Sequence, residues 1–113
     1  MITNLINAKG NATVNQFVIY EENIVTKKPV IAFQSYQSRV CEISPNGGLG
    51  FEKVVRFGKD WDYSKTTMKH LCEFLRQNDC GVLASAKDIR EGIDRGHARY
   101  DEAIAVIYDP TME

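Results

Sequence analysis

The sequence has no long hydrophobic run and no recognisable leader at its N-terminus. A helix that crosses a bilayer needs about 20 consecutive apolar residues, and no stretch of the 113 residues comes close. Residues 1–7 also lack the positively charged start and apolar centre of a secretory signal peptide. The sequence therefore predicts a cytoplasmic protein without a membrane association.

Cysteine is scarce and irregularly spaced. The three cysteines, Cys41, Cys72 and Cys80, are odd in number and form no CxxC pair, which argues against a disulfide framework or a zinc site. Cys41 and Cys72 fall on apolar positions and are expected in the core. Cys80 stands between Asp79 and Gly81 and is expected to be the most exposed. We expect neither a metal nor a cofactor.

An excess of positive charge is also missing. The 14 Lys and Arg residues and 15 Asp and Glu residues give a formal net charge of −1, whereas strong nonspecific binding to phosphates needs a cationic excess. Aromatic residues of the expected strands could stack single-stranded bases, but core packing is their usual role: Phe17, Tyr20, Phe33, Tyr36, Phe51 and Phe57. Nucleic acid is therefore disfavoured as a partner.

The sequence contains no recognisable catalytic constellation. Its two histidines, His70 and His97, have no acid or nucleophile at a known spacing. A metal site built from Cys80, His97 and Asp94 matches no ligand pattern. The glycine-rich residues 47–50 lie between two expected strands and not before a helix, so they indicate a hairpin turn and not a phosphate loop. We therefore expect that the protein is not an enzyme.

The composition is typical of a single globular domain over residues 1–113. The chain is 43% hydrophobic and 26% charged, which excludes a disordered or low-complexity protein. Residues 1–12 hold few apolar side chains and end in a Gly-Asn turn signal. They are expected to form a loose N-terminal arm.

Three β-strands are expected before the first helix. Residues 14–21 are aromatic and β-branched, with apolar side chains on both faces. Residues 30–43 predict one long second strand with a bend or bulge at residues 35–38, where polar side chains interrupt it. A Pro-Asn-Gly-Gly sequence in residues 44–48 predicts a hairpin turn. The third strand, residues 49–57, would then be an antiparallel neighbour of the second.

Two helices and a fourth strand follow. The first helix is predicted from apolar residues at i, i+3, i+4 and i+7: Met68, Leu71, Cys72 and Leu75. Asp62 or Ser64 is expected to cap it, and a second helix is expected from Ser85 to Gly96. Residues 103–108 are a continuous apolar run typical of a strand. The order β-β-β-α-α-β predicts an α+β fold, with an antiparallel sheet of about four strands packed on two helices.

Candidate partner-binding residues lie at the corner before the first helix, in the polar middle of the second strand and on the outer helix face. They are Tyr36, Arg39, Trp61, Asp62, Tyr63, Lys65 and Lys69. Aromatic and charged side chains of this kind anchor protein interfaces. The alternative for Trp61 and Tyr63 is that they fix the corner to the core, and the alternative for Lys65 and Lys69 is solvation of an exposed face.

Several segments together resemble one family of proteins. They are NQFVI at residues 15–19, FQSYQS at residues 33–38, WDYSKTTMKHL at residues 61–71 and the helix start at residues 85–89. This combination is similar to a family of small uncharacterised proteins that phages and mobile elements of bacteria encode. The resemblance carries no reaction with it.

What the resemblance implies is a context for the protein. Small phage proteins without catalytic residues are often binders that block a host protein, so we expect an inhibitor of a bacterial defence system, such as a CRISPR nuclease, in the host cytoplasm. A homodimer formed through a sheet edge is one possible state. Two alternatives stay open: a nucleic-acid-binding accessory protein, and a binder of a small nucleotide signal.

Overall fold

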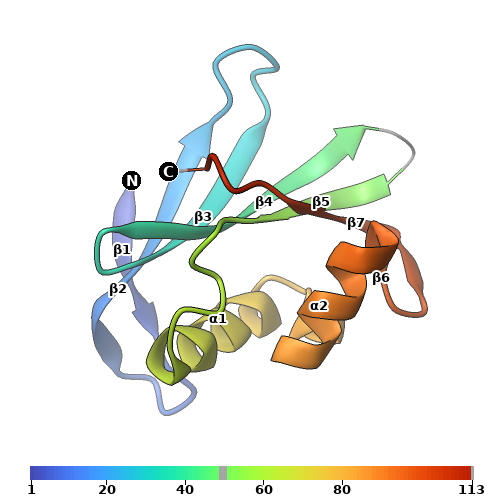
Figure 1. Ribbon diagram of the computed structural model, residues 1–113. Helices are drawn as coiled ribbons and strands as arrows, with labels where there is room; N and C mark the ends of the chain where they lie inside the picture. The colour runs from blue at the N-terminus through green and yellow to red at the C-terminus, as the bar shows by residue number, and fades with distance from the viewer. Residues whose placement is uncertain (49–50, 113) are drawn as a thin grey trace.

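The protein folds as one sheet with two helices on one of its faces (Figure 1). A computed structural model describes residues 1–48 and 51–112. Within them the sheet has seven strands in the order β1-β2-β3-β4-β5-β7-β6. The strands are β1 (Ile2–Ile6), β2 (Ala12–Glu22), β3 (Pro29–Ser35), β4 (Ser38–Gly48), β5 (Phe51–Phe57), β6 (His97–Ala98) and β7 (Asp101–Tyr108). The α+β fold is confirmed, while the expected count of four strands is too low.

Strands β5 and β7 are parallel, with Val55 opposite Val106, whereas the other neighbouring strands are antiparallel. A parallel pair needs a long crossover connection. The crossover contains α1 (Lys65–Gln77), the 3₁₀ helix η1 (Gly81–Leu83) and α2 (Ala86–Arg95). The sheet is therefore mixed and mostly antiparallel, and the strand expected at residues 103–108 is part of β7.

Both α-helices begin at the predicted signals. The Oγ of Ser64 accepts a hydrogen bond from the backbone N–H of Thr67 at 3.1 Å, which caps α1. The Oγ of Ser85 accepts from the N–H of Asp88 at 3.1 Å and caps α2 in the same way. Gly96 ends α2 with a φ of 80°, which glycine adopts without a steric cost. Local capping chemistry is therefore enough to place these helices.

One face of α1 packs against the sheet. The predicted apolar stripe is buried or partly buried: Met68, Leu71, Cys72 and Leu75. Phe74, which the sequence analysis left out, is fully buried and stacks on Phe33 of β3 with ring centroids 5.5 Å apart. In the described part of the chain, no helix has the length and apolar character of a membrane span.

The N-terminal residues form an edge strand, so the expectation of a loose arm is wrong for β1. Ile2 lies opposite Ile19 of β2 in an antiparallel pair, and Leu5 is fully buried in the hydrophobic core. The segment is polar and short, so its local sequence does not indicate a strand. Pairing with β2 and the burial of Leu5 hold it in place.

The long second strand expected at residues 30–43 is two strands. β3 and β4 pair antiparallel with Ser35 opposite Ser38, so Tyr36 and Gln37 form a two-residue turn. The irregularity was expected at this position, but the chain reverses there instead of bending. Tyr36 has a φ of 55°, a conformation for which turns normally select glycine, asparagine or aspartate.

Strand β4 continues through residues 44–48, where a turn was expected. It pairs with β5, with Pro45 opposite Lys53 and Gly48 opposite Phe51, and its register shifts between these two pairs. β4 and β5 are therefore antiparallel neighbours as predicted, although the expectation of a turn over residues 44–48 is wrong. Residues 49–50, part of the expected glycine-rich turn and third strand, lie outside the described residues.

Candidate functional site

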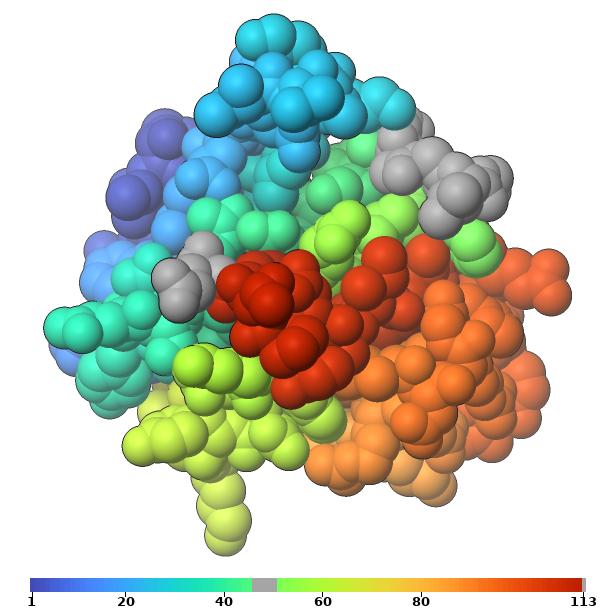
Figure 2. All heavy atoms as spheres, turned by 45° about the horizontal axis from the view of Figure 1, so that its top comes forward, coloured from blue at the N-terminus to red at the C-terminus, as the bar shows by residue number. Residues whose placement is uncertain are grey.

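An open cleft of about 860 Å³ lies where the β3–β4 turn faces the start of α1. The turn (teal) and the corner before α1 (yellow-green) lie on the same side of the molecule in Figure 2. The cleft is lined by the turn residues 35–38, by Asn15 and Phe17 of β2, by Val40 of β4, and by corner and helix residues described below. Three parts of the chain that are distant in sequence therefore build it.

The β3–β4 turn is one wall of the cleft. The backbone N–H of Tyr36 donates to the carbonyl oxygen of Asn15 at 2.7 Å, and the Gln34 side-chain amide donates to the carbonyl oxygen of Tyr36 at 2.8 Å. Tyr36 and Asn15 both have a left-handed φ, of 55° and 61°. Tyr36 is 56% exposed, so its side chain is accessible to solvent.

The corner before α1 is the opposite wall and includes Asp60, Tyr63, Ser64 and Thr67. Tyr63 is 79% exposed, and its backbone N–H donates to the carbonyl oxygen of Asp60 at 3.2 Å. Thr67 is buried, and its hydroxyl lies 3.0 Å from that of Ser35. This hydroxyl pair ties the end of β3 to the first turn of α1, so it fixes the distance between the two walls.

The residues that line the cleft are mostly polar and weakly acidic, although most of its surface is apolar. Of the described residues that line it, Asp60 is the one acid, and none is Lys, Arg or His. The hydroxyl groups of Ser35, Ser64 and Thr67 are partly satisfied by one another. The lining can offer hydroxyl, amide and phenol groups together with an apolar patch from Phe17 and Val40, but it offers no positive charge to a phosphate.

Of the seven candidate residues, the structure brings two together at this cleft, Tyr36 and Tyr63. Trp61 is 6% exposed and belongs to the core. Its ring meets Phe57 edge-on at 6.2 Å, and the Arg90 guanidinium lies 5.3 Å from the ring centroid. Trp61 therefore fixes the corner to the core, whereas Tyr63 is exposed at the cleft.

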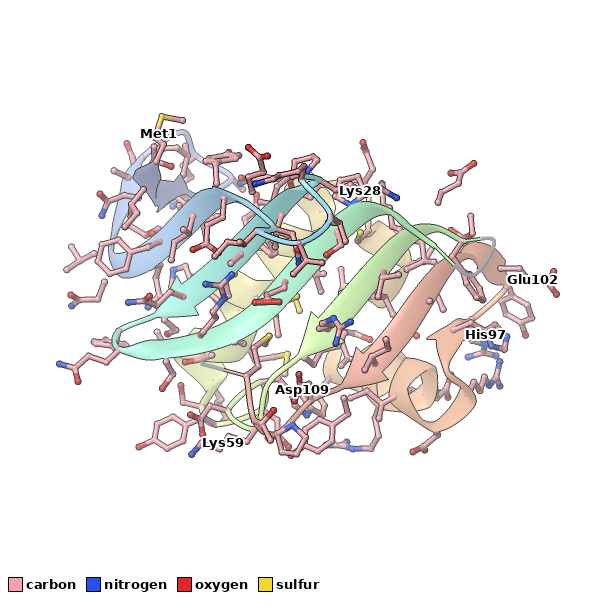
Figure 3. All side chains as sticks on the ribbon, turned by 90° about the horizontal axis from the view of Figure 1, so that it is seen from above. Met1, Lys28, Lys59, His97, Glu102 and Asp109 are labelled. Atoms are coloured by element: carbon pink, nitrogen blue, oxygen red, sulfur yellow. The ribbon has the colours of Figure 1, made fainter. Side chains whose placement is uncertain are left out.

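Figure 3 shows from above the face of the sheet that the helices do not cover. Arg39 pairs with Gln34 of β3, and the neighbouring Phe33 packs on Phe74 of α1, so Arg39 lies on that uncovered face. It is hydrogen-bonded to Glu21, and its Nε lies 2.8 Å from Glu42. The hydrogen bond from Arg39 lowers the pKa of Glu21 below the ordinary glutamate value. Glu42 of this ion cluster pairs with the fully buried Ala32 of β3, and none of the three charged residues lines the cleft.

The other three candidates lie around the corner without lining the cleft. Asp62 is exposed, and its carboxylate lies 3.5 Å from the guanidinium of Arg90. Lys65 and Lys69 are exposed on α1. Solvation of an exposed helix face accounts for the two lysines, since surface charges of this kind contribute little to a fold.

Seven polar residues of the cleft were not among the candidates selected from the sequence: Asn15, Ser35, Gln37, Ser38, Asp60, Ser64 and Thr67. Ser64 was identified as a helix cap and not as part of a site. Thr67 carries one detectable signal, because it is a polar residue on the side of α1 where buried residues cluster. Asn15 and Ser35 carry none, since their position depends on how β2 and β3 pair.

The described residues contain neither an exposed thiol nor a cluster of metal ligands. All three cysteines are buried, and burial raises the pKa of the Cys80 thiol to about 11. The expectation that Cys80 is exposed is wrong, because its N–H bonds back to Leu75 after α1 and draws the side chain into the core. No group of three His, Cys, Asp or Glu side chains is placed to hold a metal among residues 1–48 and 51–112.

One family of proteins matches this chain. The model of DUF8033, a family of unknown function, matches residues 1–91. The match ends within α2, so β6 and β7 lie beyond it. Comparison with curated proteins and with solved structures found no match. The family match shows neither an activity nor a phage or mobile-element origin, so the cleft itself is the basis for a functional argument.

Proposed function

We propose that this chain, which belongs to the family of unknown function DUF8033, is a protein-binding module whose cleft receives a segment of a partner protein. It acts by binding and not by catalysis. The observation that carries the proposal is the pair of exposed tyrosines, Tyr36 and Tyr63, on the two walls of one cleft. Tyrosine is enriched among the residues that dominate binding energy in protein interfaces.

Hydrogen bonds fix the backbone of both walls, which favours binding. Tyr36 stands on a two-residue turn that hydrogen bonds hold on both sides, and Tyr63 directly precedes the cap of α1. A tyrosine has two side-chain torsions, so ordering it on a rigid support costs little entropy. The strained φ of Tyr36 is consistent with a site, since strained backbone often persists where function requires it.

The chemistry of the cleft favours a peptide over a phosphate-bearing ligand. Asp60 would repel a nucleotide or a nucleic-acid backbone, and the described lining supplies no cation to offset it. The hydroxyl and amide groups of the walls suit the N–H and C=O groups of an extended peptide, and Asp60 favours one with a nearby Lys or Arg. The nucleotide and nucleic-acid alternatives have no such complementarity in the cleft.

The narrower form of the proposal names the partner class. The sequence resemblance to small phage-encoded proteins supports a host defence protein, such as a CRISPR nuclease, as the partner that the module inhibits. The cleft would then bind a segment that the defence protein needs for its own activity and so block it. This narrower form rests on the resemblance and on the absence of a catalytic pattern in the sequence, and the cleft geometry supports only the binding step.

A pull-down from bacterial lysate with matched tyrosine variants tests the proposal. Tyr100 is the control for Tyr36, because it is 88% exposed and has a φ of 58° in the β6–β7 turn, yet it does not line the cleft. We expect partners that the wild type and Tyr100→Ala retain and that Tyr36→Ala and Tyr63→Ala lose. Equal capture by all four proteins would place the binding surface elsewhere.

A further inference from the structure

Strand β1 leaves one edge of the sheet open. It is the first strand in the sheet order, and β6, at the other edge, has two residues (Figure 1). The N-terminal residues lie at the rim of the molecule in Figure 2. An open edge presents a row of backbone N–H and C=O groups that can pair with another strand.

The hydrogen bonds of β1 show which of its backbone groups face outward. Met1 and Tyr20 exchange both of their backbone hydrogen bonds, at 3.0 and 2.8 Å, and the Thr13 hydroxyl donates to the carbonyl oxygen of Leu5 at 2.8 Å. The odd-numbered residues therefore face β2. Because the groups alternate along a strand, the N–H and C=O groups of Ile2, Asn4 and Ile6 point away from β2.

A side chain from α1 supports this direction. The carbonyl oxygen of Ile6 accepts a hydrogen bond from the Gln77 side-chain amide, which lies outside the β1–β2 pair. A carbonyl oxygen can accept two hydrogen bonds, so this contact leaves room for a strand partner. In the described residues, no partner is recorded for the outward backbone groups of Ile2 and Asn4.

The sequence of β1 complements itself. In an antiparallel pair of two β1 strands centred on Asn4, Ile2 of each copy lies opposite Ile6 of the other. These side chains are 65% and 44% exposed in the single chain, and the pairing would cover both. The strand Ile-Thr-Asn-Leu-Ile has no charged residue and no proline, so it lacks the usual devices that prevent edge pairing and brings no like charges together.

We propose that a second copy of this chain pairs with β1 across a two-fold axis at Asn4, joining the two sheets edge to edge. The two-fold axis places the two β1 strands antiparallel, so the outward N–H and C=O groups of both copies are paired in one interface. A five-residue edge buries less than the roughly 1,600 Å² of a standard interface, so the dimer dissociates on dilution. The proposal is independent of the cleft and of its partner.

Cysteine cross-linking tests the register. Hydrogen-bonded residues opposite one another have Cα atoms about 5.5 Å apart, within the roughly 4.4–6.8 Å that a disulfide spans. We expect Asn4→Cys to form a disulfide-linked dimer under mild oxidation. Ile2→Cys alone should not, because its copies would be about 13 Å apart, whereas an equimolar mixture of Ile2→Cys and Ile6→Cys should. The native cysteines are buried and do not compete.

Sedimentation velocity tests the dimer without a cross-link. The weight-average sedimentation coefficient of the wild type should rise with concentration from about 10 µM to about 1 mM, as expected for a small interface. Ile2→Pro removes an outward N–H that β2 does not use, and the exposed Ile2 side chain makes no hydrogen bond, so this variant should stay monomeric with an unchanged melting temperature. A wild type that is monomeric throughout, an Ile2→Pro dimer, or an Ile2→Cys self-cross-link would each overturn the proposal.

Discussion

The backbone N–H of Tyr36 donates to the carbonyl oxygen of Asn15 at 2.7 Å, and both residues hold a left-handed φ. One lies in a two-residue turn and the other within β2, so two left-handed residues meet at the wall of the cleft. Asparagine adopts this conformation readily, whereas for Tyr36 it costs on the order of 1–3 kcal/mol. The pairing of β2 with β3 must supply that energy, and the result is a fixed position for the Tyr36 side chain.

Replacing Tyr36 by glycine should increase the stability of the fold while it removes partner binding. Glycine adopts a left-handed φ without a Cβ clash, so we expect Tyr36→Gly to raise the free energy of unfolding by about 1 kcal/mol. The same variant removes the phenol and should lose the partner. Urea unfolding and pull-down on one preparation measure both effects. A Tyr36→Gly protein that is less stable than the wild type would show that the backbone at this turn is not strained.

The contact between Ser35 and Thr67 should be a measurable part of the stability. Thr67→Val keeps the shape of the side chain, but it leaves the buried Ser35 hydroxyl without its partner. We expect a loss of about 1–3 kcal/mol in the free energy of unfolding. Thr66→Val is the matched control, since Thr66 is exposed on the same helix turn. Equal losses in the two variants would reflect helix propensity alone.

Gly92 should tolerate no larger side chain, although a helix-interior glycine normally weakens a helix. A Cβ built there would lie 3.1 Å from a Val106 methyl of β7 and 3.2 Å from a Leu83 methyl. We expect Gly92→Val to lose about 1–3 kcal/mol by overpacking. Lys87→Val adds the same β-branched residue on the exposed side of α2 and should have little effect in urea unfolding. Similar losses for both would contradict close packing of α2 on β7.

Acid should weaken the fold partly through Glu21. The hydrogen bond from Arg39 lowers the pKa of this carboxyl in the folded state, so the stability it contributes is present above its unfolded pKa. That contribution is lost as the pH falls through the lower folded pKa. Glu21→Gln should therefore show a smaller decline in melting temperature between neutral and acidic pH than Glu22→Gln, its neighbour. Identical declines would mean that the ion pair is screened by solvent.

Local signals in the sequence were enough to place the helices and missed much of the sheet. Ser64 and Ser85 cap their helices through bonds to residues three positions away, and such bonds are visible in a sequence. The turn at Tyr36 has no glycine, asparagine or proline at its centre, so nothing marks it. β1 depends on pairing with β2, and the parallel β5–β7 pair joins residues about 50 positions apart in the chain.

The candidate site was also predicted only in part from the sequence. The sequence selected Tyr36 and Tyr63 because exposed aromatics anchor interfaces, and the structure places both at one cleft. It also selected Trp61, which is buried because its large apolar ring packs on Phe57. Composition cannot tell an aromatic anchor of the core from one of an interface, because both use the same side chains. The contact between Ser35 and Thr67 is a tertiary contact and has no local signature.

The most direct test of the binding cleft is the affinity of a captured partner for matched tyrosine variants, measured by calorimetry. Truncating a central anchor typically costs about 2 kcal/mol or more, which is roughly a 30-fold rise in the dissociation constant. We expect that rise for Tyr63→Ala and a change within about twofold for Tyr100→Ala, because Tyr100 does not line the cleft. Unchanged affinity in Tyr63→Ala, or equal losses in both variants, would contradict the cleft as the binding site.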